Sequence, residues 1–351
     1  MSFLLTAYLN VIKRFILPKS DGTSVGIDIG AGDCKLVELK KDGDSFTLLN
    51  WAVEPIKTGD VTQTLKKILE RLDTPCKNLY TSVFGKGTLI RYIDMPRMSL
   101  EDLRNSFAIE ADKYFPFAQN QVYTDCFILD PEGKEKRMLV LAAAVKKEIV
   151  DQRVRLLTDL GFQVNFIGIN PIALANVLNV LNAHYQHDKG AATAFLDMGD
   201  SVSNLTIMVN NLPWFTRDVS VGGRDITSRI SNVLGVGFEE AERLKNRPAE
   251  RLEDILNASE TAIMNIVNEL RLSFDYFMTE RNVEIKQLLL TGGGSMLQGI
   301  SEIFARNLDV KVSQWNPLTS LNISSHLSLE EVNKNSLKLG VALGLALYEY
   351  D

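Results

Sequence analysis

The chain has 351 residues, 45% hydrophobic and 23% charged, so it can bury a sizeable core and general disorder is not expected. Its 44 acidic and 38 basic residues give a formal net charge of −6, which argues against a nucleic-acid-binding protein. Three cysteines and three histidines are too few for a disulfide framework or a zinc ribbon. We expect a cytosolic protein with two domains or one bilobal unit.

The first segment, residues 1–17 (MSFLLTAYLNVIKRFIL), predicts an amphipathic helix, and a linker follows it up to residue 22. Its apolar run is too short to span a bilayer, which takes about 20 residues. Its charges follow the run, whereas those of a signal peptide precede it. A helix in a membrane interface is one interpretation, and a helix docked on the protein's own surface or on a partner is the other. The apolar contacts of an interfacial helix would be Phe3, Leu4, Leu5, Leu9, Ile12 and Phe15.

Two glycine-containing turns lie 169 residues apart, each between two predicted strands. They occupy residues 24–39 (SVGIDIGAGDCKLVEL) and 194–208 (AFLDMGDSVSNLTIM). A shift of 169 positions places Asp28 on Asp197 without a gap. The first turn is neither a Walker A loop nor a Rossmann turn, because a strand follows it where those motifs need a helix. Two copies in register predict an internal duplication into two similar lobes.

A nucleotide held between these lobes would suit the residues of the turns. Glycine lets backbone N–H groups approach a phosphate, and Lys35 can supply a point charge to the β or γ phosphate. Asp28 and Asp197 can face a hydrated Mg²⁺ from opposite sides. The nucleotide candidates are Gly30, Ala31, Gly32, Asp33 and Lys35 in the first turn, and Gly199, Asp200, Ser201 and Ser203 in the second. The alternative is two ordinary hairpins with solvated turns.

A third motif, residues 288–304 (LLLTGGGSMLQGISEIF), predicts a buried strand that passes through a glycine loop into a helix. The loop would offer a planar base a flat surface and the N–H groups of a helix start. Residues 238–245 (FEEAERLK) predict a helix start with two charged residues on one face, which could hold a ribose and an adenine or form a surface ion pair. These elements add Gly222, Gly223, Glu242, Lys245, Gly292, Gly293, Gly294 and Ser295 to the nucleotide candidates.

These elements, in this order, resemble the actin, hexokinase and Hsp70 superfamily. The two hairpins are similar to its phosphate loops, and the glycine loop is similar to its adenosine loop. Residues 170–178 (NPIALANVL) and 339–347 (LGVALGLAL) are similar to its two hinge helices. The resemblance implies an α/β, actin-like (ribonuclease H-like) duplicated two-lobe ATPase fold that binds ATP and Mg²⁺.

The first turn departs from the superfamily pattern. Relatives generally place hydroxyl residues where this chain has residues 31–34 (AGDC). Asp33 and Asp200 also bring negative charge close to a polyphosphate, which is tolerable only with Mg²⁺ or if the carboxylates point away. We therefore expect reduced nucleotide affinity. No residue stands out as the one that positions an attacking water, so weak or no ATPase activity is expected.

The resemblance also implies a domain organisation. Residues 1–22 are the N-terminal helix and linker, 23–190 the first lobe and 191–351 the second lobe. A small α+β insert occupies about 80–160 of the first lobe, and a helical subdomain about 228–285 of the second, whose last helix (337–348) returns to the first lobe. The insert is predicted as strands 81–84 and 89–95, helix 99–114, strands 122–129 and 137–145, and helix 146–160.

An insert of this kind resembles the superfamily branch that holds FtsA and the type IV pilus assembly family PilM. Residues 91–96, 108–117, 222–227 and 270–277 are similar to PilM in particular. The resemblance implies a cytoplasmic ATP-binding scaffold, peripheral on the inner membrane, that serves pilus assembly and twitching motility. Its partner would be the cytoplasmic tail of the inner-membrane protein PilN, with PilO reached through PilN and the pilus motor ATPases as further partners.

The PilN tail would lie as an extended peptide in a groove between the first-lobe core and the insert. The residues expected there are Arg91, Tyr92, Pro96, Tyr114, Phe115 and Pro116. For Phe115, ordinary core packing at a helix end is the alternative. In type II secretion a similar fold is fused to a transmembrane segment, which this chain lacks, so its membrane partner would be a separate protein.

Two other functions stay open at this point. A small-molecule kinase of the same superfamily would need a catalytic aspartate, and Asp125 is available, but it lies in a predicted strand without a polar sugar-binding cluster. An FtsA-like membrane-associated filament former would carry its amphipathic anchor at the C-terminus, whereas here the apolar helix is at the N-terminus.

Overall fold

The computed structural model describes residues 22–56, 60–72, 79–130, 136–181 and 190–349. The predicted N-terminal helix, with its candidate membrane residues Phe3, Leu4, Leu5, Leu9, Ile12 and Phe15, lies outside these ranges. Within them, no helix combines the length and the apolar character needed to cross a bilayer.

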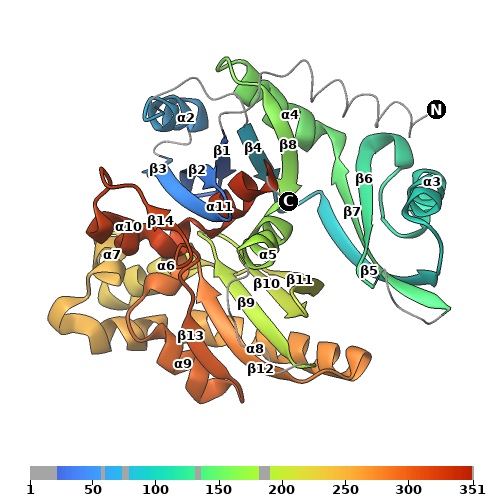
Figure 1. Cartoon of the computed structure of the whole chain (residues 1–351). Coiled ribbons are helices and arrows are strands. Elements are labelled where there is room, and N and C mark those ends of the chain that lie inside the picture. The colour runs from blue at the N-terminus through green and yellow to red at the C-terminus, as the bar shows by residue number, and fades with distance from the viewer. Residues whose placement is uncertain (1–21, 57–59, 73–78, 131–135, 182–189, 350–351) are drawn as a thin grey trace.

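The two larger sheets have the same strand order, β3-β2-β1-β4-β8 and β11-β10-β9-β12-β13, and the first carries β14 as an additional edge strand (Figure 1). In both, an antiparallel three-stranded meander is followed by two parallel strands. The strands of the first sheet are β1 (Thr23–Ile29), β2 (Asp33–Asp42), β3 (Ser45–Pro55), β4 (Leu79–Val83), β8 (Val164–Ile169) and β14 (Asn322–Ile323). Those of the second are β9 (Ala192–Met198), β10 (Ser203–Val209), β11 (Leu212–Val219), β12 (Ile285–Thr291) and β13 (Lys311–Gln314).

The pairing register confirms the predicted duplication. Asp28 lies opposite Lys35 in the first hairpin, and Asp197 lies opposite Asn204 in the second. Each residue of the first pair lies 169 positions before its counterpart in the second pair, which is the shift that aligns the two sequence segments. The two hairpins are therefore equivalent strand by strand. An internal duplication explains both the shared strand order and this register.

A third sheet of three antiparallel strands, β5-β7-β6, lies beside the two lobes (Figure 1). Its elements are β5 (Thr88–Pro96), α3 (Leu100–Glu110), a 3-10 turn (Ala111–Lys113), a second one (Gln119–Gln121), β6 (Val122–Ile128) and β7 (Arg137–Lys146). Ser99 caps α3 by accepting a hydrogen bond from the Asp102 N–H at 3.1 Å. Phe107 and Phe115 lie in the core between α3 and the sheet.

The strand predicted at residues 81–84 as part of the insert does not belong to this small sheet. It is β4, which pairs with β1 and β8 in the six-stranded sheet. All five of its residues are buried, as expected for a parallel strand covered on both faces. The helix predicted at 146–160 is α4 (Lys147–Thr158), which packs against β4, β7 and β8 and so joins the small sheet to the core.

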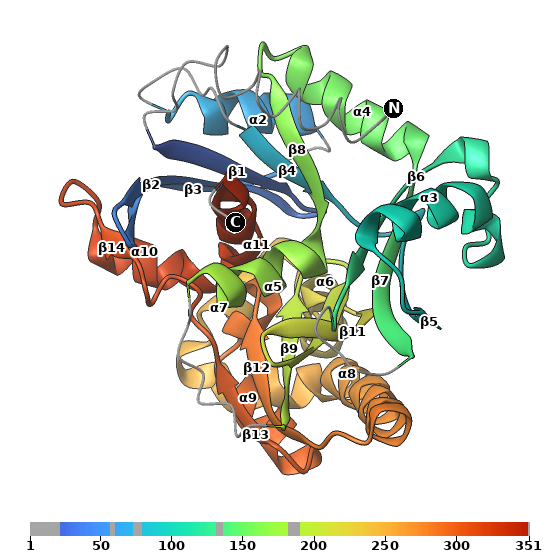
Figure 2. The ribbon, with the colours of Figure 1, turned by 45° about the vertical axis from the view of Figure 1, so that its right-hand side comes forward.

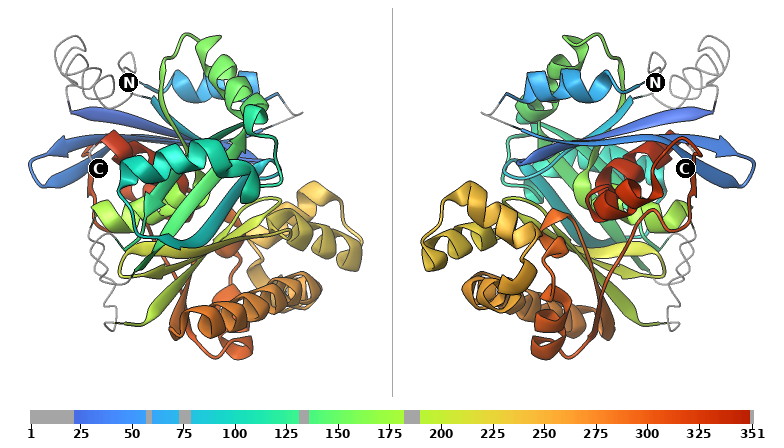
Figure 3. Two further views of the ribbon diagram at one scale, coloured as in Figure 1. Left: turned by 90° about the vertical axis from the view of Figure 1, so that its right-hand side faces the viewer. Right: turned by 90° about the vertical axis from the view of Figure 1, so that its left-hand side faces the viewer.

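Alternating side chains divide the five-stranded sheet into two faces. On one face, Leu196, Leu205 and Leu290 belong to the large core that the helices of the second lobe cover. These helices are α6 (Gly223–Leu234), α7 (Phe238–Asn246), α8 (Leu252–Arg281), preceded by a 3-10 turn (Ala249–Arg251), and α9 (Ile300–Asn307). Figure 3 shows α6 to α8, in yellow to orange, on one side of this sheet.

Two helices lie between the two main sheets, α5 (Asn170–Val180) and α11 (Gly340–Ala346) (Figure 2). They pack so closely that a Cβ on Gly344 would lie 1.7 Å from the Ala173 carbonyl oxygen. A Cβ on Gly26 of β1 would lie 1.9 Å from the Ala342 carbonyl oxygen. These two glycines therefore let α11 approach both α5 and the first sheet.

The remaining elements are α2 (Val61–Leu69), α10 (Leu329–Asn335) and the 3-10 turns Gly293–Met296, Ser336–Lys338 and Leu347–Glu349. Of these, α2 packs against β2 and β3 of the first sheet. The helix predicted at 337–348 is thus α11 with a 3-10 turn on either side. Asp60 caps α2 by accepting a hydrogen bond from the Gln63 N–H at 2.9 Å.

Candidate functional site

A cleft of about 440 Å³ lies where the two hairpin turns, the glycine loop and α7 meet. Most of the predicted nucleotide and metal residues line it. These are Asp28, Gly30, Ala31, Gly32, Asp33, Lys35, Asp197, Gly199, Asp200, Ser201, Gly223, Glu242, Lys245, Gly292, Gly293 and Gly294. Segments from both halves of the chain therefore meet at one site.

The first hairpin holds its charges in a compact network. The Lys35 ammonium lies 2.6 Å from Asp33 Oδ1 and 3.0 Å from Asp28 Oδ2. Burial by itself lowers the pKa of Lys35, but the two carboxylates outweigh burial and raise that pKa above its ordinary value. Lys35 is therefore a permanent cation at the bottom of the cleft.

The second hairpin faces the first across the cleft. A Cβ on Gly32 would lie 2.9 Å from Asp200 Cγ, so the two turns are in direct contact. The Asp200 carboxylate accepts a hydrogen bond from Arg224 Nε at 2.9 Å and forms an ion pair with Nη2 of the same guanidinium at 2.8 Å. Arg224 also lies over the ring of Phe238, 5.8 Å from its centroid. An arginine that the sequence analysis did not single out thus neutralises Asp200.

The first glycine of each turn uses its N–H within the turn. Gly30 N–H donates to the Asp33 carbonyl at 3.0 Å, and Gly199 N–H donates to the Val202 carbonyl at 3.1 Å. Gly30 and Gly199 therefore shape the turns, and phosphate contacts through the backbone would fall to the residues that follow them, such as Gly32.

Two buried acceptors belong to residues that line the cleft. Asp28 Oδ1 and Asn170 Oδ1 are both buried, and within the described residues neither has a hydrogen-bond partner. Desolvation, followed by the charge of Asp28, raises the pKa of Asp197 to about 6. No described group of three or more acidic, histidine or cysteine side chains could hold a bare metal ion. This donor set fits a hydrated Mg²⁺ whose waters donate to the carboxylates.

The glycine loop differs from its prediction. It does not run directly into a helix, because a 3-10 turn at Gly293–Met296 intervenes and α9 begins only at Ile300. Gly292 has a φ of +82°, and a Cβ there would lie 2.3 Å from Asp197 Oδ1. Only glycine fits this position, which joins the loop to the second aspartate of the cleft.

The predicted pair on α7 is present, but the lysine is committed to the protein. Lys245 Nζ donates to Glu242 Oε2 at 2.7 Å, to Thr227 Oγ1 at 2.8 Å and to the Gly223 carbonyl at 3.2 Å. These three acceptors use all three protons of the buried ammonium. Lys245 therefore ties α7 to α6. Glu242 is engaged within the protein as well, because its Oε1 accepts a hydrogen bond from Asn246 Nδ2 at 2.9 Å.

Three predicted nucleotide residues do not line the cleft. Ser203 is fully buried and donates to the Val221 carbonyl at 2.7 Å, and Ser295 is fully buried and donates to the Gly292 carbonyl at 2.7 Å. A Cβ on Gly222 would lie 2.5 Å from the Asp200 carbonyl oxygen, so Gly222 is packed behind the second turn. All three support the loops from behind.

The structure adds several residues that the sequence analysis did not assign to the site: Asn170, Asn204, Arg224, Phe238, Asn246, Asn335 and Lys338. The last of these lies beside the glycine loop, and its Nζ is 3.9 Å from Asp33 Oδ2. The only sequence signal for Asn170 and Lys338 is that each lies at the start of a predicted hinge helix.

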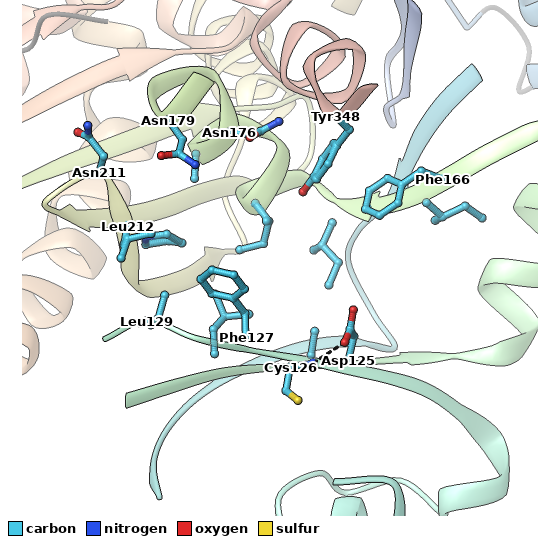
Figure 4. A pocket seen from close by; sticks show the side chains of 18 of the residues that line it. Asp125, Cys126, Phe127, Leu129, Phe166, Asn176, Asn179, Asn211, Leu212 and Tyr348 are labelled. Atoms are coloured by element: carbon cyan, nitrogen blue, oxygen red, sulfur yellow. Dashed lines mark hydrogen bonds between the residues drawn. The ribbon is translucent and has the colours of Figure 1, made fainter. Parts of the chain in front are cut away.

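A second cavity, a groove of about 360 Å³, lies between the insert and the two lobes. Its walls include Phe127 of β6, Phe166 of β8 and Tyr348 after α11, and Figure 4 shows Phe127 pointing into the space that Phe166 and Tyr348 border. The rings of Phe166 and Tyr348 pack with their centroids 4.3 Å apart. Asn176 and Asn179 of α5 lie on the side of the groove across from Phe127 (Figure 4).

The residues predicted to contact a peptide do not line this groove, which lies between the core and the insert as the peptide site was expected to. Phe115 is 3% exposed and packs beside Phe107 in the insert's own core, and Tyr114 stacks on the same ring. Tyr92 packs in an apolar cluster with Leu141. Arg91, Pro96 and Pro116 are exposed elsewhere on the insert.

Known proteins are similar to this chain in sequence. The cell division protein FtsA of Bacillus subtilis (strain 168) is 24% identical over 277 residues, which cover 69% of this chain and 61% of that protein. This match thus spans less than two thirds of the length of that relative. FtsA of Enterococcus hirae is 23% identical over 375 residues, which cover 90% of this chain and 84% of that protein.

Solved structures show the same fold. A PilM-PilN type IV pilus biogenesis complex matches with a TM-score of 0.82 and 23% identity, over 93% of this chain and 98% of the matched chain. The ethanolamine utilization protein EutJ of Carboxydothermus hydrogenoformans gives 0.56 and 16%, over 98% of both chains. MreB 5 of Spiroplasma citri bound to AMPPNP gives 0.50 and 11%, over 95% and 97%. The predicted actin-like fold is confirmed.

A comparison with family models assigns the chain to a protein family. The model described as type IV pilus assembly protein PilM matches residues 26–350. That range begins within β1 and includes both lobes and the insert. The chain belongs to the family of the type IV pilus assembly protein PilM.

Proposed function

We propose that this chain is an ATP-binding scaffold of type IV pilus assembly that holds the cytoplasmic tail of a PilN-like inner-membrane protein. The observation that carries the nucleotide part is the pair of unpartnered buried acceptors, Asp28 Oδ1 and Asn170 Oδ1, in a cleft lined by two glycine turns. Buried acceptors without donors are costly, so a ligand that brings donors to both explains them.

In this proposal Asp28 and Asp197 hold a hydrated Mg²⁺, and Lys35 and Lys338 face the phosphates. When bound, Mg²⁺ neutralises phosphate charge and supplies water protons to the carboxylates. The glycine loop and the exposed side of Phe238 border the far end of the cleft, where a base and ribose fit. We propose weak or no hydrolysis, because no residue of the sequence stands out as the one that positions an attacking water.

The groove suits an extended peptide. It lies between β6, an edge strand of the three-stranded sheet, and β8, an edge strand of the six-stranded sheet. Edge strands offer backbone N–H and C=O groups to an added strand, and alternate side chains of such a peptide would fill apolar pockets beside Phe127 and Phe166. A similar solved complex contains PilM and PilN, which supports a PilN tail as the occupant.

The same two helices border both cavities. Asn170 and Val341 line the cleft, whereas Asn176, near the other end of α5, and Tyr348, just beyond α11, line the groove. Asn176 Nδ2 donates to the Gly344 carbonyl at 3.1 Å and so ties α5 to α11. We propose that nucleotide sets the angle between the lobes and, through these helices, the width of the groove.

Calorimetry with the full chain tests this function. We expect it to bind MgATP, and separately a synthetic peptide with the N-terminal cytoplasmic sequence of a PilN-like protein. A scrambled peptide of the same composition is the control. A folded protein that bound neither MgATP nor the tail peptide would contradict the proposal.

The membrane link is the remaining part of the proposal. Residues 1–17 would lie in the inner-membrane interface, and would place the protein peripherally on its cytoplasmic side. Deletion of residues 1–19 should reduce flotation with anionic liposomes and leave MgATP binding unchanged. Equal flotation of the full and the shortened chain would contradict the membrane interpretation and favour a helix that docks on the protein's own surface or on a partner.

A further inference from the structure

The cation of the first hairpin is already engaged by the protein. Lys35 Nζ lies 2.6 Å from Asp33 Oδ1, so the two groups form a close ion pair, and the lysine side chain is only 13% exposed. The other carboxylate oxygen, Asp33 Oδ2, lies 3.9 Å from Lys338 Nζ. Asp33 thus sits between two cations, one from a hairpin of the first lobe and one from the segment before α11.

This ion pair lies over the turn where a phosphate is expected. A Cβ on Gly30 would lie 3.0 Å from Lys35 Nζ and 3.6 Å from Asp33 Oδ1. The carboxylate therefore occupies the space next to the turn backbone and between the two lysines. An anionic oxygen in that place makes the contacts that a phosphate oxygen would make.

The second hairpin shows that the fold does not need this carboxylate. The equivalent of Asp33, 169 positions later, is Val202, and the equivalent of Lys35 is Asn204. Both turns close in the same way, through the carbonyl of Asp33 or Val202. The main chain of Asp33 shapes the turn, and the turn does not require its carboxylate.

We propose that the Asp33 carboxylate is a built-in competitor that occupies Lys35 and Lys338 in place of a polyphosphate and so sets the affinity of the cleft. Binding requires Lys35 to exchange the carboxylate for a phosphate oxygen. The released carboxylate then faces the polyphosphate unless Mg²⁺ or Lys338 neutralises it. This inference rests on the proposed nucleotide function of the cleft.

The test compares ligand affinities of matched variants of the full chain. The ligands are MgATP and magnesium tripolyphosphate, which has no base or ribose. Asp33→Asn and Asp33→Val, the second copied from the other hairpin, should bind both ligands about tenfold more tightly than the unmodified chain, because a hydrogen bond to a charged group no longer has to break. Asp44→Asn, an equal charge change at the exposed β2–β3 turn, should leave both affinities unchanged.

A second background separates competition for Lys35 from simple repulsion of the phosphates. Lys35→Gln keeps a hydrogen-bond donor for Asp28 but removes the cation. In this background Asp33→Asn should give a clearly smaller gain than in the unmodified chain. An equal gain in both backgrounds would mean repulsion alone and would overturn the inference. Thermal unfolding of each variant establishes that it is folded.

The remaining outcomes distinguish this inference from the proposed function. If the unmodified chain binds MgATP and Asp33→Asn binds it no better, the inference is wrong and the nucleotide function stands. If Asp33→Asn binds MgATP more weakly, Asp33 is a ligand of the magnesium–nucleotide complex, and the inference is again wrong. If no folded variant binds MgATP or tripolyphosphate, both proposals fail.

Discussion

The cleft and the groove border the same two helices, but they are built from different kinds of residue. The cleft consists of turns, and its charges come from short segments such as residues 28–35. The groove consists of strand edges and of single side chains from distant segments, such as Phe127 and Tyr348. The difference suggests that charge and turn shape select the ligand in the cleft, whereas apolar surface and free strand edges select it in the groove.

The largest effect is expected from a substitution that removes ligand binding in the cleft but keeps it in the groove. Gly292→Ala should destabilise the chain by about 3 kcal/mol and abolish MgATP binding, because its Cβ would meet Asp197 in a backbone conformation with positive φ. Tail-peptide binding should persist at temperatures where the variant is folded. Chemical denaturation and calorimetry measure both effects.

Gly85→Ala is the matched control for that change. Gly85 has a φ of +80°, but no atom lies within 4 Å of the place where its Cβ would be. Only the backbone strain remains, so the loss should be about 1 kcal/mol with unchanged MgATP binding. Equal losses for Gly85→Ala and Gly292→Ala would contradict the role assigned to the contact between Gly292 and Asp197.

A substitution in the groove should weaken peptide binding and leave MgATP binding unchanged. Phe127 is 52% exposed and borders the groove, so Phe127→Ala should weaken tail-peptide binding about tenfold or more while MgATP affinity stays the same. Tyr123→Ala removes another exposed aromatic ring from the same strand, outside the groove, and should leave both affinities unchanged. A peptide affinity equally reduced by both substitutions would argue against the groove as the peptide site.

The pH dependence of stability should come from the cleft. Asp197 has a pKa of about 6 in the folded chain and an ordinary value of 3.8, so the folded state binds more protons between these values. Stability should therefore fall as pH rises from about 4 to 6, and the penalty should remain above pH 6. At pH 8, Asp197→Asn should be more stable than the unmodified chain by about 1–2 kcal/mol, and this advantage should vanish near pH 4.

Urea denaturation at pH 4, 6 and 8 without Mg²⁺ measures this effect. Asp159→Asn, at the C-terminal end of α4 and away from both cavities, provides the control for a lost carboxylate. An Asp197→Asn variant with the same stability difference at all three pH values would show that the carboxylate is not perturbed in the folded chain.

The smallest effect is expected at the rim of the cleft. The ion pair of Arg224 with Asp200 has side chains that are 55% and 28% exposed, so solvent screens it. Arg224→Gln should change stability by less than about 0.5 kcal/mol. Thermal unfolding at low and at high salt checks this, and a loss of several degrees in both conditions would show that the pair is more than a screened surface contact.

Local patterns in the sequence were enough to predict the hairpins and their duplication. Strand alternation around Asp28 and Asp197 marks the two turns, and helical spacing placed Glu242 and Lys245 on one face, where they form an ion pair of 2.7 Å. Spacing could not show that Lys245 is buried against Gly223 and Thr227, because that contact joins two helices.

The residues that line the groove could not be predicted from the sequence. They come from segments spread along the chain from Arg104 to Tyr348, and none of these has a pattern that distinguishes a groove wall from ordinary surface or core. The PilM resemblance placed a peptide site between the core and the insert, but the residues chosen from it either pack inside the insert, as Phe115 does, or are exposed elsewhere on it, as Arg91 is. Lys338 was missed for the same reason, since it meets Asp33 only through the tertiary fold.

We propose that the cleft and the groove bind two different ligands, MgATP and an extended peptide. Hydrogen–deuterium exchange of the full chain with each ligand tests it most directly. MgATP should protect residues 29–35, 198–203 and 291–296, and the tail peptide should protect residues 125–129 and 166–169. The proposal would be contradicted if both ligands protected the same segments, or if neither ligand protected the segments expected for it.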